Sequence, residues 1–452
     1  MDIFDDFARR AVVYRGAIDN SRVYPGEDAI SKLQQLREPL QDDPVGASVV
    51  LSILDDFGSP ATVRSSGGRY FGFVTGSSLP GAMVSKLMAT LWDQNAALSI
   101  MSPVASLAEE VSAGWLLSLL GLPDGTATSF VTGATMANFT ALAAARHFLL
   151  KDLGWDVLSK GMFGAPEIKV VVGEEVHVSL LKALSLVGFG RERVVRIPTD
   201  DQGRIIADAV ADYEGPTIVC VQAGNVNSGA FDPVGAICRK VKKENVWVHV
   251  DGAFGLWAAA SAEKKHLVDG VELADSWATD AHKWLNVPYD SGLAFVRHRQ
   301  PLIESMSATA AYLPETSGRE PMQYVPEMSR QARGIAIWGA LKSLGKKGLA
   351  ALIEKNCRQA RRFAWSLEDA GYRILNQVDL NQVLVSFGDA QTNQLIIQEI
   401  QQEGTCWCGG TTWRGASAMR ISVSSSETTD EDVERSLEAI IRIARKFSRS
   451  NG

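Results

Sequence analysis

The sequence is poor in cysteine, in long apolar runs and in surplus positive charge. Its five cysteines are an odd number without framework spacing, which excludes a disulfide-built scaffold and favours a reducing compartment, by default the cytoplasm. No apolar run reaches membrane-spanning length, and the strongest, such as Ile218 to Val221, are short enough for strands. The acidic first six residues do not resemble a secretory signal. A net charge of −7 argues against a nucleic-acid partner, because backbone phosphates need surplus Lys and Arg.

Two cysteines lie close enough in the sequence to be considered as metal ligands. Cys406 and Cys408 form a C-x-C motif, but a metal site would need two more ligands nearby and the sequence shows none. The stretch from Gly409 to Thr412 predicts a turn between strands. We therefore expect no metal centre at this position.

The bulk composition is that of a folded globular protein. Hydrophobic residues make up 46% and charged residues 21% of the 452 residues, so disorder is not expected outside the termini. Short apolar segments alternate with helical patterns such as Met136 to Leu150 and Val178 to Val187. The strand candidates are Phe130 to Thr132, Val170 to Val172, Thr217 to Val221, Val246 to Val250 and Leu293 to Val296. This alternation predicts an α/β fold whose sheet is largely parallel and covered by helices on both faces.

Three regions are expected along the chain. Residues 1–60 look helical, residues 61–320 carry the alternating pattern, and residues 321–452 form a smaller α/β unit. In that last region, strands are expected at Gln382 to Phe387 and Met419 to Val423. The final helix is expected to begin at the capping box Thr428-x-x-Glu431, which makes Glu431 a cap and not a catalytic acid.

A first candidate site lies where a predicted strand passes into a predicted helix, at Gly133, Ala134 and Thr135. Glycine lets the backbone approach an anion closely, and the free N–H groups of the helix start, with the Thr135 hydroxyl, can hold a phosphate. The signal is weak alone, because helix starts rich in Gly and Thr are common caps. It matches neither a Walker loop nor a dinucleotide fingerprint.

Three further residues carry possible chemistry. Asp251 ends an apolar strand, where a carboxylate can pair with a ring N–H, although taken alone an ordinary helix cap explains it better. Lys283 lies between apolar and aromatic neighbours, and partial burial would favour the neutral amine that forms an imine. His177 follows another strand, and a lone histidine there is usually structural. The spacing of 32 residues from Asp251 to Lys283 leaves room for a helix and a strand, so both side chains can reach one cleft.

Together these segments resemble the group II pyridoxal-phosphate decarboxylases, the family of glutamate, aromatic amino acid and diaminobutyrate decarboxylases. The resemblance spans most of the chain, and the triplet His282-Lys283-Trp284 is its most specific element. The other matching motifs are Arg69 to Val74, Asp93 to Asn95, Ser102-Pro103, the segment around Gly133, His177, Ala223-Gly224, Gly229 to Pro233, His249 to Asp251 and Asp290 to Gly292. The family implies the fold-type I architecture, with a large, mostly parallel seven-stranded sheet domain and a smaller C-terminal α/β domain. It also implies a homodimer with two equivalent sites.

The resemblance assigns roles to individual residues around pyridoxal 5′-phosphate. Lys283 would carry the Schiff base and Asp251 would face the pyridine nitrogen. Ala253 and His177 would lie on the two faces of the ring, and Arg420 would bind the substrate carboxylate with its bidentate guanidinium. The remaining cofactor contacts would come from Gly133, Ala134, Thr135, Gln222 and His282. The implied reaction removes CO₂ from an L-amino acid and leaves the amine.

The match departs from the family at points that affect the reaction. Gln222 stands where a threonine is common, and the usual Asp-Ala-Ala reads Asp251-Gly252-Ala253. Family members often use a loop tyrosine to protonate the substrate carbon. The matching region from Glu315 to Arg330 holds only Tyr324, which we take as a substrate-contacting candidate, and Tyr312 lies just before it. Loss of that tyrosine can turn such an enzyme toward oxygen-dependent aldehyde formation.

Other activities share the scaffold. An aminotransferase would need a second arrangement for the keto acid, and a carbon–carbon lyase of the sphingosine-phosphate lyase type would need a basic cluster for a phosphorylated substrate. A catalytically silent scaffold is a further alternative, against which the intact Lys283, Asp251 and His177 argue. The accepted side chain stays open, because the small residues of 95–99 disfavour a flat aromatic substrate while Tyr70, Phe71, Trp407 and Trp413 could line a pocket for one.

Overall fold

The computed structural model describes residues 2–308 and 318–448 of the chain. They fold into two compact units. The larger unit comprises Ser78–Arg358 and Asn376–Gln382, and the smaller comprises Met1–Ser77, Gln359–Leu375 and Val383–Gly452. The three regions expected from the sequence, residues 1–60, 61–320 and 321–452, remain a prediction.

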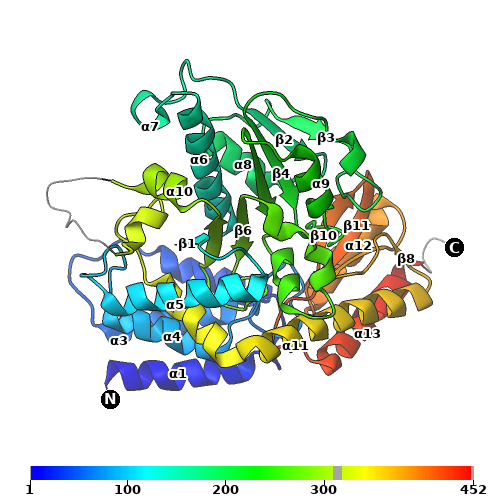
Figure 1. The fold of residues 1–452 in the computed structure, drawn as a ribbon. Coiled ribbons are helices and arrows are strands. Elements are labelled where there is room, and N and C mark those ends of the chain that lie inside the picture. Colours follow the sequence, from blue (N-terminus) through cyan, green and yellow to red (C-terminus); the bar gives the residue numbers. More distant parts are fainter. Residues whose placement is uncertain (1, 309–317, 449–452) are drawn as a thin grey trace. The chain divides into compact units, whose positions relative to one another are not determined.

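A seven-stranded sheet forms the centre of the larger unit (Figure 1). Its strands, in chain order, are β1 (Ala127–Val131), β2 (Lys169–Gly173), β3 (Val195–Ile197), β4 (Thr217–Gln222), β5 (Val246–Asp251), β6 (Ser276–Asp280) and β7 (Gly292–Val296). Their order in the sheet is β1-β7-β6-β5-β4-β2-β3. β7 runs against both of its neighbours, while β6, β5, β4, β2 and β3 pair in parallel. The mostly parallel α/β sheet that the sequence predicted is thereby confirmed.

The larger unit also contains α-helices, of which α6 (Ala134–Asp152) packs on the sheet. They are α4 (Pro80–Trp92), α5 (Pro103–Leu120), α6 (Ala134–Asp152), α7 (Val157–Lys160), α8 (Val178–Leu186), α9 (Val234–Val241) and α10 (Arg299–Met306). α6 contacts β5, β6 and β7 as well as α8 and α10 (Figure 1). Its run of buried alanines from Ala143 to Ala145 lets the helix approach the strands closely. Leu142 and Leu149 of α6 join Trp247 of β5 in the main core cluster.

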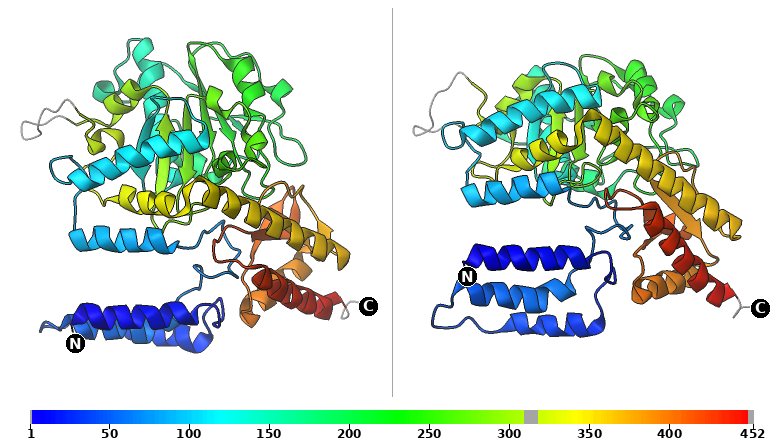
Figure 2. Two further views of the ribbon diagram at one scale, coloured as in Figure 1. Left: turned by 60° about the horizontal axis from the view of Figure 1, so that its bottom comes forward. Right: turned by 90° about the horizontal axis from the view of Figure 1, so that it is seen from below.

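The smaller unit contains a four-stranded sheet in the order β10-β11-β9-β8. Its strands are β8 (Arg373–Ile374), β9 (Gln382–Ser386), β10 (Gly409–Trp413) and β11 (Ala416–Ser422), and its C-terminal helices are α12 (Ala390–Glu403) and α13 (Asp430–Ser448). The N-terminal helices are α1 (Ile3–Ala17), α2 (Glu27–Lys32) and α3 (Ala47–Ile53). α1 and α3 lie side by side (Figure 2). Arg10 of α1 contributes to this packing through ion pairing with Asp55 at 2.8 Å.

One long helix contributes residues to both units. α11 (Arg333–Asp369) is interrupted at Gly345, whose φ of 59° is accessible to glycine at little cost. Residues 333–358 belong to the larger unit and residues 359–369 to the smaller one. Among the described residues, no helix is both long and apolar enough to cross a bilayer.

Two local predictions for the C-terminal region are wrong. The stretch from Gly409 to Thr412 lies in strand β10 and does not form a turn, because it pairs antiparallel with β11. The helix α13 begins one residue later than predicted. Thr429 is the cap, and it exchanges hydrogen bonds of 3.0 Å with Asp432, while the Thr428 hydroxyl donates to the Gly68 carbonyl at 2.8 Å. The reciprocal capping geometry is therefore present, but with Asp432 in place of Glu431.

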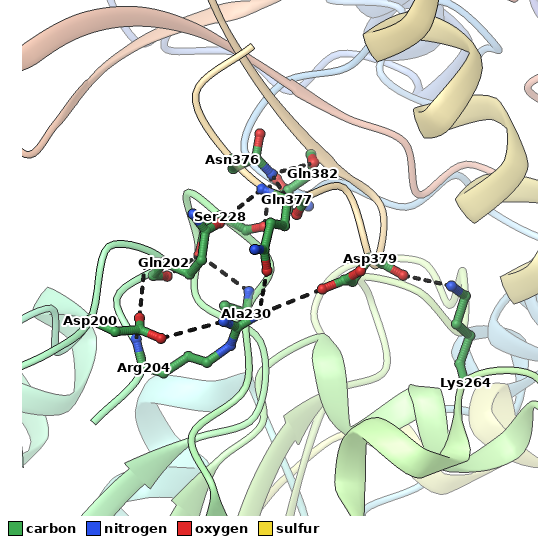
Figure 3. A network of polar contacts seen from close by, with 10 residues as sticks. All are labelled: Asp200, Gln202, Arg204, Ser228, Ala230, Lys264, Asn376, Gln377, Asp379 and Gln382. Carbon is green, nitrogen blue, oxygen red and sulfur yellow. Dashed lines mark hydrogen bonds and ion pairs between the residues drawn. The ribbon is translucent and has the colours of Figure 1, made fainter. Parts of the chain in front are cut away.

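A polar network fixes the segment 376–382 within the larger unit (Figure 3). Asn376 Nδ2 lies 2.9–3.2 Å from three backbone carbonyl oxygens, those of Ser228, Gln377 and Gln382. Further contacts join the Gln377 amide to Gln202 Oε1 at 2.8 Å and Arg204 to Asp379 at 3.5 Å. Most of these acceptors are backbone carbonyls, and the bonds to those of Ser228 and Gln382 are buried.

We predict that Asn376→Ala lowers the free energy of unfolding by about 2–3 kcal/mol, because it removes three hydrogen bonds to backbone carbonyls, two of which are buried. Urea denaturation of the purified protein measures this change. Asp379→Ala is the matched control in the same segment. Its side chain is half exposed, so its loss should cost under about 1 kcal/mol. Equal effects of the two substitutions would contradict the role given to Asn376.

Candidate active site

Six strands of the large sheet, β1 to β6, share a direction, and only β7 runs against them. Their carboxyl ends therefore lie along the edge at which open α/β sheets bind ligands. The residues that follow or end these strands are Gly133 after β1, His177 after β2, Gln222 at the end of β4, Asp251 at the end of β5, and Asp280 at the end of β6 with Lys283 three residues further on. The topology therefore gathers at this edge the segments that the sequence singled out.

The start of α6 presents free backbone amides at this edge. Gly133 is its N-cap, and no side chain caps the helix. Ala134 donates its N–H to Asp280 Oδ1 at 2.6 Å. Within the described part of the chain, the amides of Thr135 and Met136 have no acceptor. Two unpaired N–H groups at the positive end of a 19-residue helix form a site for an anion.

Two glycines set the position of this anion site. Gly292, the first residue of β7, pairs with Val131 and with Asp280 on its two sides. A Cβ on Gly292 would lie only 2.4 Å from the Gly133 Cα, and a Cβ on Gly133 would lie 3.1 Å from His282 Cε1. The backbone preceding α6 can therefore lie directly against the start of β7 only because Gly292 lacks a side chain.

Lys283 and Asp280 form the charged centre of the site. Lys283 Nζ lies 3.0 Å from Asp280 Oδ2, with the lysine side chain 19% and the aspartate side chain 4% exposed. Oδ1 of the same carboxylate accepts the Ala134 amide and lies 3.4 Å from His282 Nε2. A single buried carboxylate thus joins the amine to the amide end of α6.

His282 is held in one orientation beside this carboxylate. The Ser291 amide donates to His282 Nδ1 at 3.1 Å, so the neutral ring carries its proton on Nε2, which faces Asp280. Burial lowers the pKa of His282, and the negative charge of Asp280 opposes this while Lys283 adds to it. The ring of Tyr289 lies 4.4 Å from the His282 ring, centroid to centroid.

Asp251 is almost fully buried at the end of β5. Its Oδ2 accepts a hydrogen bond from Asn138 Nδ2 at 3.1 Å, and its Oδ1 accepts one from the Ala253 amide at 3.2 Å. These two bonds fix the orientation of the carboxylate at the end of the strand, where it could accept a hydrogen bond from a ring N–H.

His177 and Gln222 are linked through the loop that follows β2. His177 caps α8, with Nδ1 at 2.7 Å from the Ser179 Oγ, and its ring is partly exposed. Gln222 donates from Nε2 to the Glu175 carbonyl at 2.9 Å, and its backbone amide donates to Asp232 at 2.6 Å. Burial raises the pKa of that Asp232 carboxyl to about 7. Gln222 therefore ties the end of β4 to the loop that carries His177.

The two substrate candidates belong to different units. Tyr324 is 2% exposed in the main core cluster, between the guanidinium groups of Arg319 at 4.5 Å and Arg299 at 5.5 Å. Arg420 lies in β11 of the smaller unit, where burial lowers its pKa. Tyr312 falls outside the described residues. The roles assigned to Tyr324 and Arg420 stay predictions.

Sequence reasoning missed two residues that the structure places in the site. Asn138 lies one helical turn after Ala134 and contacts Asp251, and only the spacing along a predicted helix could have indicated it. Asp280 ends β6, a strand that was not predicted because Ser-Trp-Ala-Thr-Asp has no clear apolar pattern. Its position after a strand was the available signal, since Asp251 was identified by the same argument.

The donor set fits pyridoxal 5′-phosphate. The amides of Thr135 and Met136 suit a phosphate dianion, and the buried carboxylate of Asp251 suits a pyridine N–H. The same edge carries the primary amine of Lys283 and the partly exposed imidazole of His177. Anion site, ring partner and amine thus all occur on one sheet edge.

Comparisons with known proteins agree with this chemistry. The family model described as the pyridoxal-dependent decarboxylase conserved domain matches residues 63–388. The aromatic-L-amino-acid decarboxylase of Bacillus atrophaeus is 26% identical over 405 residues, which cover 84% of this chain and 82% of the relative. The aspartate 1-decarboxylase of Aliivibrio fischeri is 30% identical over 257 residues, 53% of this chain and 47% of the relative. The structure of Oryza sativa TDC with PLP and tryptamine has a TM-score of 0.90 at 21% identity, covers 98% and 97% of the two chains, and shows the same fold.

We predict that Gly292→Ala weakens the binding of pyridoxal 5′-phosphate roughly tenfold or more, because the new methyl group displaces the backbone at Gly133. Absorbance titration of the apoprotein with the cofactor measures the affinity. Gly114→Ala in α5 is the matched control, since no atom lies within 4 Å of its added Cβ. An unchanged affinity in Gly292→Ala would contradict the fit of the two glycines.

Proposed function

Since the chain belongs to the family of pyridoxal-dependent decarboxylases and is a pyridoxal 5′-phosphate-dependent amino-acid decarboxylase, we propose that Lys283 is the residue that holds its cofactor. The observation that carries the assignment is the position of the Lys283 amine, 3.0 Å from the Asp280 carboxylate that also binds the start of α6. An amine in this place lies next to the free amides that suit a phosphate.

The chain's own groups have distinct tasks in this proposal. When bound, the cofactor accepts the electrons of the bond that breaks at the substrate Cα. The amides of Thr135 and Met136 hold its phosphate, and Asp251 accepts a hydrogen bond from its ring nitrogen and keeps the proton there. His177 packs on one face of the ring and Ala253 on the other. Gln222 acts through the loop that carries His177.

Lys283 and Asp280 act as a pair in this proposal. The Lys283 amine would hold the cofactor, and Asp280 Oδ2, 3.0 Å from Nζ, would keep the lysine side chain in place. Arg420 is proposed to bind the substrate carboxylate through its two parallel N–H groups. The carboxylate must be held so that its bond to Cα stands across the ring plane, because orientation selects the bond that breaks.

Oxygen-dependent formation of an aldehyde is a second candidate. It is favoured by the buried position of Tyr324, the one tyrosine of the matching region, which leaves it poorly suited to protonate a substrate. This reaction would consume the amino acid, O₂ and water and yield the aldehyde, CO₂, ammonia and H₂O₂. The side chain of the substrate is not settled, because the named relatives include an aromatic and an aspartate decarboxylase.

The decisive test supplies the holoenzyme with each common L-amino acid and measures CO₂, amine, aldehyde and H₂O₂ separately. We expect CO₂ and amine in equal amounts from one substrate class, and no release above background from Lys283→Ala. CO₂ with aldehyde and H₂O₂ would identify the oxidative reaction. Wild-type release that persists in Lys283→Ala would overturn the assignment of this lysine.

We also propose that the enzyme is a cytoplasmic homodimer. The free, buried cysteines suit a reducing compartment. α4 exposes an apolar face formed by Val84, Leu87 and Leu91, which are 47–61% exposed, and a second copy related by twofold symmetry would cover such a face.

Light scattering should therefore give twice the chain mass of 48.8 kDa. The double substitution Leu87→Glu and Leu91→Glu should shift the protein to monomers, because it places charges in an apolar interface. Leu158→Glu, at an equally exposed leucine of α7, should leave the mass unchanged. A wild-type monomer that is fully active would refute the proposed dimer.

A further inference from the structure

A chain of buried side chains leads away from Asp251 through the core of the larger unit. Asp251 Oδ2 lies 3.1 Å from Asn138 Nδ2, and Asn138 Oδ1 lies 2.8 Å from His249 Nε2. His249 Nδ1 lies 2.8 Å from the Ser276 Oγ, which lies 2.8 Å from Trp247 Nε1. The residues come from β5, β6 and α6, so three elements share one set of hydrogen bonds.

The direction of each bond follows from the Asp251 end. An ionised carboxylate only accepts, so the Asn138 amide must present its nitrogen to Asp251 and its oxygen to His249. The Asn138 oxygen only accepts, so His249 Nε2 must carry a proton. The neutral His249 ring then has a bare Nδ1, which accepts from the Ser276 hydroxyl.

The other end of the chain is compatible with this direction. The Trp247 indole N–H can only donate, so it donates to the Ser276 oxygen. The Ser276 hydroxyl keeps its own proton, which it can give to His249 Nδ1. The tautomer with the single proton of His249 on Nε2, which the Asp251 end requires, therefore satisfies every bond of the chain.

Burial leaves no competing partner for this chain. Asn138, His249 and Ser276 are each 0% exposed, and Asp251 is 4% exposed. Burial lowers the pKa of His249 to about 3, so the ring stays neutral at ordinary pH. A neutral His249 with its proton on Nε2 keeps the Asn138 amide in one orientation. In the reverse orientation the amide nitrogen would face the His249 N–H and the amide oxygen would face the Asp251 carboxylate.

We propose that His249 and Asn138 are positioning residues that keep the Asp251 carboxylate aimed at the cofactor ring, which rests on the cofactor assignment made above. The Asn138 N–H fixes Asp251 Oδ2, and His249 fixes the Asn138 amide in turn. A correctly placed Asp251 carboxylate would hold the proton on the ring nitrogen, and would thereby keep the cofactor able to accept electrons.

Substitution of His249 by glutamine and by leucine distinguishes a positioning role of this residue from a packing role. Glutamine can donate from its amide nitrogen to Asn138 and accept from Ser276 with its oxygen, so His249→Gln can keep both bonds. His249→Leu fills similar space but keeps neither. Asn138→Leu removes the donor to Asp251 directly, whereas Asn138→Asp would direct a second carboxylate at it.

The tautomer is measured first, in wild-type apoprotein labelled with ¹⁵N-histidine. The chain has six histidines, and the resonance missing from His249→Gln identifies His249. We expect ring nitrogen shifts of a neutral imidazole protonated on Nε2, unchanged between pH 6 and 8. A proton on Nδ1, or a charged ring, would overturn the chain, and this result does not depend on any activity.

The second measurement uses holoenzyme loaded with cofactor that carries ¹⁵N in its ring. We expect a protonated ring nitrogen in wild type and in His249→Gln, and loss of that proton in Asn138→Leu and His249→Leu. The value of kcat should fall at least tenfold in the two leucine variants while KM changes less than threefold. A protonated ring and wild-type kcat in Asn138→Leu would overturn the positioning role. A wild-type protein that binds no cofactor would refute the proposed function and leave the tautomer result standing.

Discussion

The carboxylate of Asp280 is the contact on which the site depends. It accepts the first amide of α6, it pairs with the Lys283 amine at 3.0 Å, and it lies beside the protonated nitrogen of His282. The helix that provides the anion site and the segment that provides the amine are thus held to each other by one side chain. The packing of Gly292 against Gly133 permits this arrangement, since any side chain at Gly292 would separate the two backbones.

The remaining polar groups follow from the same physical problem, which is to keep charges in a buried place. Asp251 receives two N–H donors, and Asp280 receives an amide and a cation, so each charge has a compensating partner. Asp232 shows the alternative, because burial raises its pKa to about 7 even though it accepts two backbone amides. Carboxylates with compensating partners, Asp251 and Asp280, and a carboxyl with a raised pKa, Asp232, thus all occur within the larger unit.

The sequence predicted best those strands and site residues whose amino-acid types are typical of a single structural setting. The strands β2, β4 and β5 were predicted from their β-branched runs, and Asp251 and Lys283 from their position after or between apolar segments. β3 and β6 were missed, since Val-Arg-Ile is very short and Ser-Trp-Ala-Thr-Asp mixes polar and aromatic residues. Asn138 and Asp280 could not be assigned because their importance comes from partners more than 100 residues away in the chain. The cap of α13 was misplaced by one residue because Thr428 and Thr429 are adjacent and both precede an acidic residue at the required spacing.

The central claim is that the cofactor is held by Lys283 beside the start of α6. Reduction of the holoenzyme with borohydride makes the linkage between cofactor and lysine permanent, and mass spectrometry of the digested protein then locates it. The account predicts that the pyridoxyl group lies on the peptide that contains Lys283 and on no other. A label on a different lysine, such as Lys86, or an enzyme that keeps its cofactor and turnover without Lys283, would contradict it.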